Sequence, residues 1–149
     1  MTISITAQHS NSLPDGTYGG AASGFVFYTE EGNFYYSGDT ALTMDMHLIS
    51  KGNKLDFAVL PIGDALTMGA DDAIELAAWL NIKDIVGVHY DTFGFIRIDH
   101  KKTMEKFNEA NLRLQLVEIG KTIILNGSAG SGNLQILNEP KIRSREVTI

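Results

Sequence analysis

The stretch LDFAVLPI, residues 55–62, and the residues that follow it decide the fold. This run is almost continuously apolar, which is typical of a strand that is covered on both faces. Residues 69–80 then carry apolar side chains at helical spacing, and Gly69 can serve as the N-cap of that helix. A second apolar run at residues 84–89 predicts another buried strand. Strands that alternate with helices in this way predict an α/β domain.

The residues before this unit read as an antiparallel portion of the same domain. Residues 2–8 alternate between apolar and polar, which predicts a half-buried strand with Ile3 on its apolar face. Residues 24–29 and 34–37 are rich in aromatic side chains and flank a connection that contains a glycine, so they predict a hairpin. Residues 42–49 could form a short helix.

The residues after the unit continue the alternation and then change in character. Asp99 can cap a helix that runs to about Asn111, and residues 114–119 and 122–125 read as short strands. We therefore expect residues 1–125 to form one domain.

Residues 126–149 read as a Gly/Ser-rich connector followed by a possible edge strand and a tail. The connector at 126–133 consists almost entirely of small residues. It either forms a long hairpin loop that returns one more edge strand, or is an engineered or gene-fusion joint before a loosely held tail. We favour the first interpretation for residues 134–137 and the second for the residues after Pro140.

Composition excludes several classes of protein. The chain has 149 residues, which suits one domain, and its net charge of -6 disfavours nucleic-acid binding, which depends on surplus Lys and Arg. The absence of cysteine excludes disulfide scaffolds, cysteine-ligated zinc and cysteine nucleophiles. No apolar run approaches the roughly 18 residues of a membrane span, and we find no secretion signal, so a cytoplasmic protein is expected, with no membrane and no nucleic acid among its partners.

Three polar side chains stand just beyond the ends of predicted strands, namely His9, Asp39 and His89. Strand ends in α/β sheets are where ligands and catalytic groups collect. Imidazole and carboxylate groups suit divalent metals such as zinc or iron. In the alternative interpretation each histidine is a satisfied, half-buried side chain and Asp39 is a turn residue. The spacing alone favours that alternative, because no compact metal motif is present.

Five short motifs, taken in order, change this balance. They are Ala7-Gln8-His9-Ser10, Ser37-Gly38-Asp39-Thr40, Leu60-Pro61-Ile62-Gly63-Asp64, Thr67-Met68-Gly69 and Val88-His89-Tyr90-Asp91-Thr92-Phe93. Together they resemble the metal-dependent hydrolases of the metallo-β-lactamase-fold superfamily, and within it the YtkL-like group of uncharacterised hydrolases. The resemblance runs from about Ile3 to about Leu125.

The resemblance implies roles for the residues that match. His9 corresponds to a metal-ligand histidine, Asp39 to the carboxylate that bridges two metals, and His89 to the last ligand histidine. The metal is expected to be zinc, with manganese or iron as alternatives. Asp39 and Asp64 are the expected catalytic residues; Asp64 would orient a ligand histidine, although helix entry or loop solvation explains it equally well.

The chain departs from the family in one respect. The family signature H-x-H-x-D-H lies in the amino-terminal half of its domain, whereas this chain has only His9, His47, His89 and His100 and no H-x-H pair. The chain therefore resembles only the carboxyl-terminal half, which implies a mixed sheet with helices on one face, half of an αβ/βα sandwich. His47 and His100 are interpreted as structural.

A half-domain would expose a sheet face that normally packs against its twin, and burial of apolar area stabilises by roughly 25 cal/mol per Å². We therefore expect the chain to form a homo-oligomer, with a symmetric homodimer attractive, or to bind a separate amino-terminal half. With the missing half supplied, the expected activity is metal-assisted hydrolysis of a small-molecule substrate. The alternatives are a non-catalytic binding or scaffold module and a truncated fragment of a longer protein.

Overall fold

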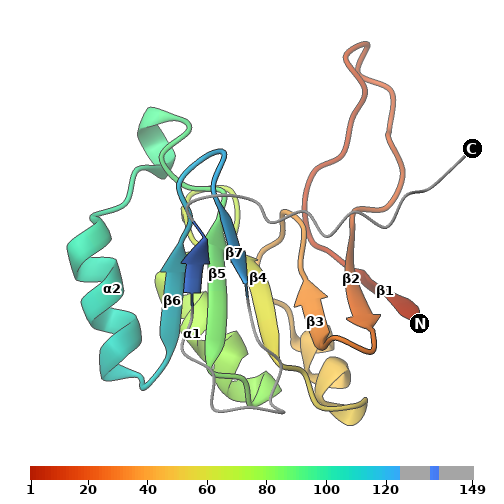
Figure 1. Ribbon diagram of the computed structural model, residues 1–149. Coiled ribbons are helices and arrows are strands. Elements are labelled where there is room, and N and C mark those ends of the chain that lie inside the picture. Colours follow the sequence, from red (N-terminus) through yellow and green to blue (C-terminus); the bar gives the residue numbers. More distant parts are fainter. Residues whose placement is uncertain (125–134, 138–149) are drawn as a thin grey trace, which may run out of the picture.

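The computed structural model of the protein describes residues 1–124 and 135–137 (Figure 1). The predicted connector and the predicted tail lie outside the described residues. The strands are β1 (Thr2–Thr6), β2 (Ser23–Tyr28), β3 (Asn33–Tyr36), β4 (Phe57–Pro61), β5 (Asp84–Val88), β6 (Arg113–Leu116), β7 (Thr122–Ile124) and β8 (Gln135–Leu137). The helical segments are the 3₁₀ helices η1 (Met44–Lys51) and η2 (Gly94–Ile96) and the α-helices α1 (Ala70–Leu80) and α2 (His100–Glu109).

Six strands form one mixed sheet in the order β1-β2-β3-β4-β5-β6. The first three pair antiparallel, as the hairpin prediction requires, and β3 to β6 pair in parallel. The predicted α/β class and mixed sheet are therefore confirmed. Strands β7 and β8 form a separate antiparallel pair.

The two α-helices begin and end at residues that are suited to capping a helix. Helix α1 follows Gly69 in extended conformation, and its first turn carries Asp71 and Asp72, which complement the positive end of the helix dipole. It ends at Asn81, whose left-handed backbone (φ 52°) lets its N–H reach the carbonyl groups of the last turn. Helix α2 is capped by Asp99, whose carboxylate accepts the N–H of Lys102 at 3.1 Å.

The two faces of the sheet are buried to different extents. On one face Val26, Tyr35 and Ala58 are at most 1% exposed, because the helices pack there around a shared core (Figure 1). The other face carries Phe27, Phe34 and Phe57 in register across three strands, and these rings are only half-buried. The predicted helix layer on one face is thus confirmed.

The prediction that residues 55–62 are covered on both faces holds only for the end of this run, because Leu60, Pro61 and Ile62 are all buried. Burial alternates along the first part of β4 and along β5, so that Ala58 and Ile85 are buried while Phe57 and Val86 are half-exposed. A continuous apolar run indicates that both faces of a strand can be buried, but it does not show that both are. Here the helices cover only one face of the sheet.

Three boundaries differ from the predicted ones. Strand β1 ends at Thr6 rather than at residue 8, and Ile3 is 40% exposed because β1 lies at the edge of the sheet. The short helix expected at 42–49 is the 3₁₀ helix η1, whose first turn is closed by the N–H of Met46 and the carbonyl of Thr43 at 3.1 Å. Strand β6 stops at Leu116, before a turn closed by Lys121. No helix among the described residues is long and apolar enough to cross a membrane.

Candidate metal centre

The candidate site is built at the carboxyl ends of three neighbouring parallel strands. Asp39 follows β3, Gly63 follows β4 and His89 follows β5. The register pairs Tyr36 with Val59, and Pro61 with Val88, so all three strands end at the same edge of the sheet. Side chains from this edge converge because parallel strands point their carboxyl ends in one direction.

Asp39 and His89 face each other across the end of β4. The Nε2 atom of His89 lies 3.6 Å from Oδ2 of Asp39, which is beyond hydrogen-bond length. The His89 side chain is 22% exposed and the Asp39 side chain 52% exposed, so both groups can be reached from solvent. His89 reaches this position with a left-handed backbone, φ 53°, which is uncommon for a residue with a Cβ atom.

This separation fits two ligands of one cation. Two atoms bound to a tetrahedral zinc ion at about 2.0–2.1 Å lie roughly 3.4 Å apart. His89 Nδ1 is buried and has no hydrogen-bond partner among the described residues, whereas a metal-binding histidine needs such a partner for its second nitrogen. No group of three or more His, Asp or Glu side chains in residues 1–124 and 135–137 is arranged to hold a metal ion.

His9 is brought to the neighbourhood of Asp39 by backbone contacts. The N–H of Gln8 donates to Oγ1 of Thr40 at 2.9 Å, and the N–H of Ala41 donates to the carbonyl of Gln8 at 3.1 Å. These bonds tie the residue before His9 to the residues after Asp39. The imidazole itself interacts with the Ser10 carbonyl, 2.7 Å from Nδ1, and no contact of it with Asp39 or His89 is present in the described structure.

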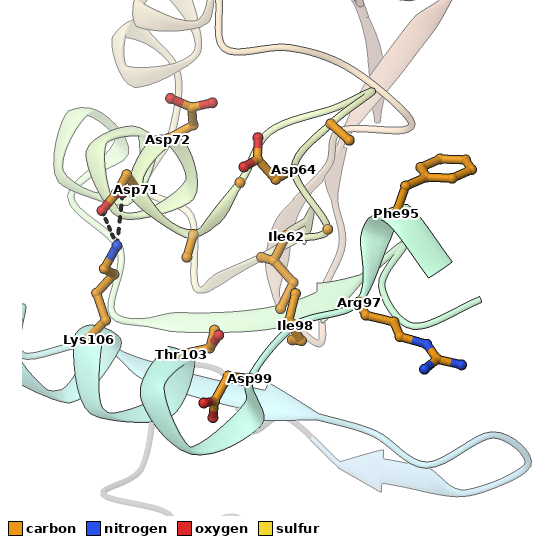
Figure 2. A pocket seen from close by; sticks show the side chains of 14 residues that line it. Ile62, Asp64, Asp71, Asp72, Phe95, Arg97, Ile98, Asp99, Thr103 and Lys106 are labelled. Carbon is orange, nitrogen blue, oxygen red and sulfur yellow. Dashed lines mark hydrogen bonds and ion pairs between the residues drawn. The ribbon is translucent and has the colours of Figure 1, made fainter. Parts of the chain in front are cut away.

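Asp64 follows Gly63 after the carboxyl end of β4, and the cavity that it lines includes neither Asp39 nor His89. Its backbone is left-handed (φ 60°), and the loop that it begins is tied to the site by the N–H of Met68, which donates to the Thr40 carbonyl at 2.8 Å. The carboxylate borders a cavity of about 520 Å³ between the first turn of α1 and the residues that lead into α2 (Figure 2). Among the described residues the Asp64 carboxylate makes no hydrogen bond, to His89 or otherwise, so its proposed role in orienting a histidine stays a prediction.

The two remaining histidines, His47 and His100, make contacts within the fold. The ring of His47 stacks on Trp79 with centroids 4.0 Å apart. His100 binds Asp91, with Nε2 2.5 Å from Oδ2, and its ring meets Tyr90 edge-on. The hydrogen bond from His100, followed by one from the Ile98 N–H, lowers the pKa of Asp91 below its ordinary value.

Two features of the site were missed by sequence reasoning. Gly63 lets the His89 backbone approach, because a Cβ atom at position 63 would overlap the His89 carbonyl oxygen. The Asp91–His100 pair closes the loop after His89. The glycine beside Asp64 could have signalled the first feature, whereas nothing in the spacing of Asp91 and His100 signals the second.

Comparison with known proteins agrees with this architecture. A family model described as a β-lactamase superfamily domain matches residues 1–90. The chain belongs to this superfamily. A relative from Christiangramia forsetii, described as a UPF0173 metal-dependent hydrolase, is 52% identical over 121 residues, which are 81% of this chain and 54% of the relative. A second, from Methylacidiphilum infernorum with the same description, is 47% identical over 121 residues and the same shares of both chains.

The superfamily fold is also found by structural comparison. A metallo hydrolase from Ignicoccus hospitalis superposes with a TM-score of 0.64 at 26% identity, covering 78% of this chain and 50% of its own. The chain therefore spans about half the length of the superfamily relatives that it matches. It is related to metal-dependent hydrolases and has half of a metallo-β-lactamase fold.

Proposed function

We propose that this chain is the carboxyl-terminal half of a metal-dependent hydrolase, in which His9, Asp39 and His89 bind a divalent metal. The convergence of Asp39 and His89, 3.6 Å apart at the ends of β3 and β5, carries the proposal. Imidazole and carboxylate ligands favour zinc, and manganese or iron are the alternatives. When bound, the cation would lower the pKa of a coordinated water and polarise the bond to be hydrolysed.

In this proposal the residues of this chain hold the cation and orient its ligands or the substrate. Asp39 is half-exposed and has two carboxylate oxygens, so it can contact two cations at once. His89 offers Nε2 from the opposite strand. Asp64 follows β4, and its carboxylate makes no hydrogen bond within the described part of the chain. It is proposed to accept a hydrogen bond from a ligand histidine or from the substrate.

The proposal requires a second half-domain, because the described residues supply too few ligands for a catalytic zinc site. The face that carries Phe25, Phe27, Phe34 and Phe57 suits such a partner. Stacked aromatic rings on an open sheet are costly to leave in water. We propose that a separate amino-terminal half or a second copy of the chain covers this face, and that the completed centre acts on a small molecule.

A metal-binding experiment tests the proposal. The chain is mixed with the amino-terminal half of the Christiangramia forsetii relative, equilibrated with Zn²⁺, freed of excess zinc by dialysis and analysed for zinc per complex. Zinc retained by the wild type is expected to be lost in Asp39→Ala and His89→Ala, and His9→Ala is expected to reduce it. His47→Ala is the matched control, because His47 stacks on Trp79, apart from Asp39. Equal zinc content in the wild type and in His89→Ala would contradict the proposal.

A second candidate function is a non-catalytic binding module. It is favoured by the lack of a three-ligand group among the described residues. Mixing the chain with the amino-terminal half of the Christiangramia forsetii relative separates the two candidates. A hydrolase half is expected to gain zinc and hydrolytic activity on nitrophenyl esters or phosphodiesters in the mixture, whereas a binding module would associate without gaining either.

A further inference from the structure

The conformation of His89 has to be imposed by its surroundings. Its φ of 53° lies in the left-handed region, which a side chain with a Cβ atom disfavours. This conformation turns the chain at the end of β5 and presents Nε2 to Asp39. Without an external constraint the residue would spend part of its time at negative φ, with its imidazole elsewhere.

Asp91 supplies a closure of the loop that begins at His89. Its backbone N–H donates to the Ile96 carbonyl at 2.9 Å. Its Oδ1 atom accepts the N–H of Ile98 at 3.0 Å, and its Oδ2 atom pairs with His100 Nε2 at 2.5 Å. Asp91 is itself left-handed, with φ 62°. One carboxylate thus joins the start of the loop to its end.

His100 connects this closure to a rigid element. It is the first residue of α2, directly after the N-cap Asp99. Helix α2 is fixed in the core by Phe107, which is fully buried. The ring of His100 packs nearly perpendicular to that of Tyr90, the residue that follows His89, with centroids 5.6 Å apart. A displacement of His89 is therefore opposed through Tyr90 and Asp91 by a packed helix.

We infer that Asp91 and His100 form a positioning pair, which holds His89 in the conformation that a metal ligand on this strand requires. The inference rests on the proposed metal role of His89. Ile96 supports the pair from inside: it is fully buried, lies against Gly63, and its carbonyl receives the Asp91 N–H. Neither Asp91 nor His100 is expected to bind the cation itself.

Nuclear magnetic resonance of the chain tests the inference without any metal. A positive φ brings the amide and α protons of one residue close together, so His89 is expected to show a strong intraresidue Overhauser effect in the wild type. In His100→Ala and Asp91→Ala we expect this effect to fall at least twofold and the His89 ring signals to shift or broaden. His100→Gln retains a donor for Asp91 and is expected to restore most of the wild-type signal.

Arg113→Gln is the matched control. Arg113 forms a two-point pair with Asp84 at the opposite end of β5, so its loss removes a comparable ion pair from the same strand. If Asp91 and His100 only stabilise the fold, all these variants will leave the His89 signals unchanged, which would overturn the inference.

Zinc titration then separates this inference from the proposed function. If the wild type binds Zn²⁺ through His89, His100→Ala is expected to weaken binding roughly 10–100-fold, as removal of a histidine's supporting contacts does, while Arg113→Gln does not. If the wild type binds no Zn²⁺ even when it is mixed with the amino-terminal half of the Christiangramia forsetii relative, the proposed function fails, and the Overhauser measurement still decides whether the pair positions His89.

Discussion

The carbonyl oxygen of His89 lies directly against the Cα atom of Gly63, in the space that any other side chain at position 63 would fill. A Cβ atom there would also lie 3.1 Å from Cβ of Ile96. After the end of β4, between Asp39 and His89, Gly63 thus places no side chain, which allows the two side chains to approach each other.

Gly63→Ala is expected to destabilise the chain and to displace His89. The added methyl group overlaps a backbone carbonyl, which cannot rotate away as a flexible side chain would. Overpacking of this kind costs about 1–3 kcal/mol. Urea denaturation measures the loss, and Gly94→Ala is the control, because a Cβ atom at Gly94 meets nothing within 4 Å. Equal stability of the two variants would contradict the contact.

The Asp91–His100 pair is expected to make stability depend on pH in the acid range. The hydrogen bond from His100 holds the pKa of Asp91 below its ordinary value of 3.8, so the folded state favours the ionised carboxylate. This contribution is complete above the unfolded-state pKa of about 3.9 and is lost as pH falls through the lower folded-state pKa. The stability difference between wild type and Asp91→Asn should therefore shrink on acidification below about pH 4. A difference that is constant in acid would be inconsistent with the pair.

The open sheet face is expected to drive self-association of the isolated chain. Phe25 and Tyr36 are cross-strand neighbours on this face, 40% and 45% exposed. Replacing both with Ser should reduce self-association in sedimentation velocity and binding of a hydrophobic dye, with a stability change of about 1 kcal/mol or less. Tyr18→Ser, at a loop residue that is 74% exposed, should change neither property. A wild type that sediments as a monomer and binds no dye would contradict self-association through this face.

The end of α1 offers a stability prediction with an internal control. Asn81 is left-handed and its N–H caps the last turn. Asn81→Gly is expected to keep or raise stability by a few tenths of a kcal/mol, because glycine adopts this conformation without strain. Asn81→Ala is expected to lower it by about 1 kcal/mol. Thermal denaturation of both variants is the measurement, and the reverse order would show that the cap is not strained.

Sequence patterns predicted the elements that depend on local chemistry. The N-caps at Gly69 and Asp99 and the alternation of β4, α1 and β5 follow from periodicity and capping residues, and the structure has them at these positions. Placing Asp39 and His89 at strand ends was also possible, because each follows a recognisable run. That these ends lie at one edge of the sheet followed from the α/β class.

Sequence patterns could not predict what depends on contacts between distant segments. An apolar run such as residues 55–62 has the same appearance whether both faces are covered within the chain or one face is left for a partner. The left-handed turn at His89 has no propensity signal, since it is imposed by the loop and by Gly63. The contact of Asp91 with His100 exists only after that loop has closed.

Asp39 and His89 follow β3 and β5, two strands that do not pair with each other because β4 lies between them. The distance between the two side chains is thus created only when all three strands have docked in register. An unfolded or partly assembled chain cannot chelate a cation through this pair. A cation that binds there would therefore require the assembled sheet, and its binding would stabilise that sheet. If the proposed cation is bound there, its removal by a chelator is expected to lower the stability of the sheet, first where β3, β4 and β5 meet.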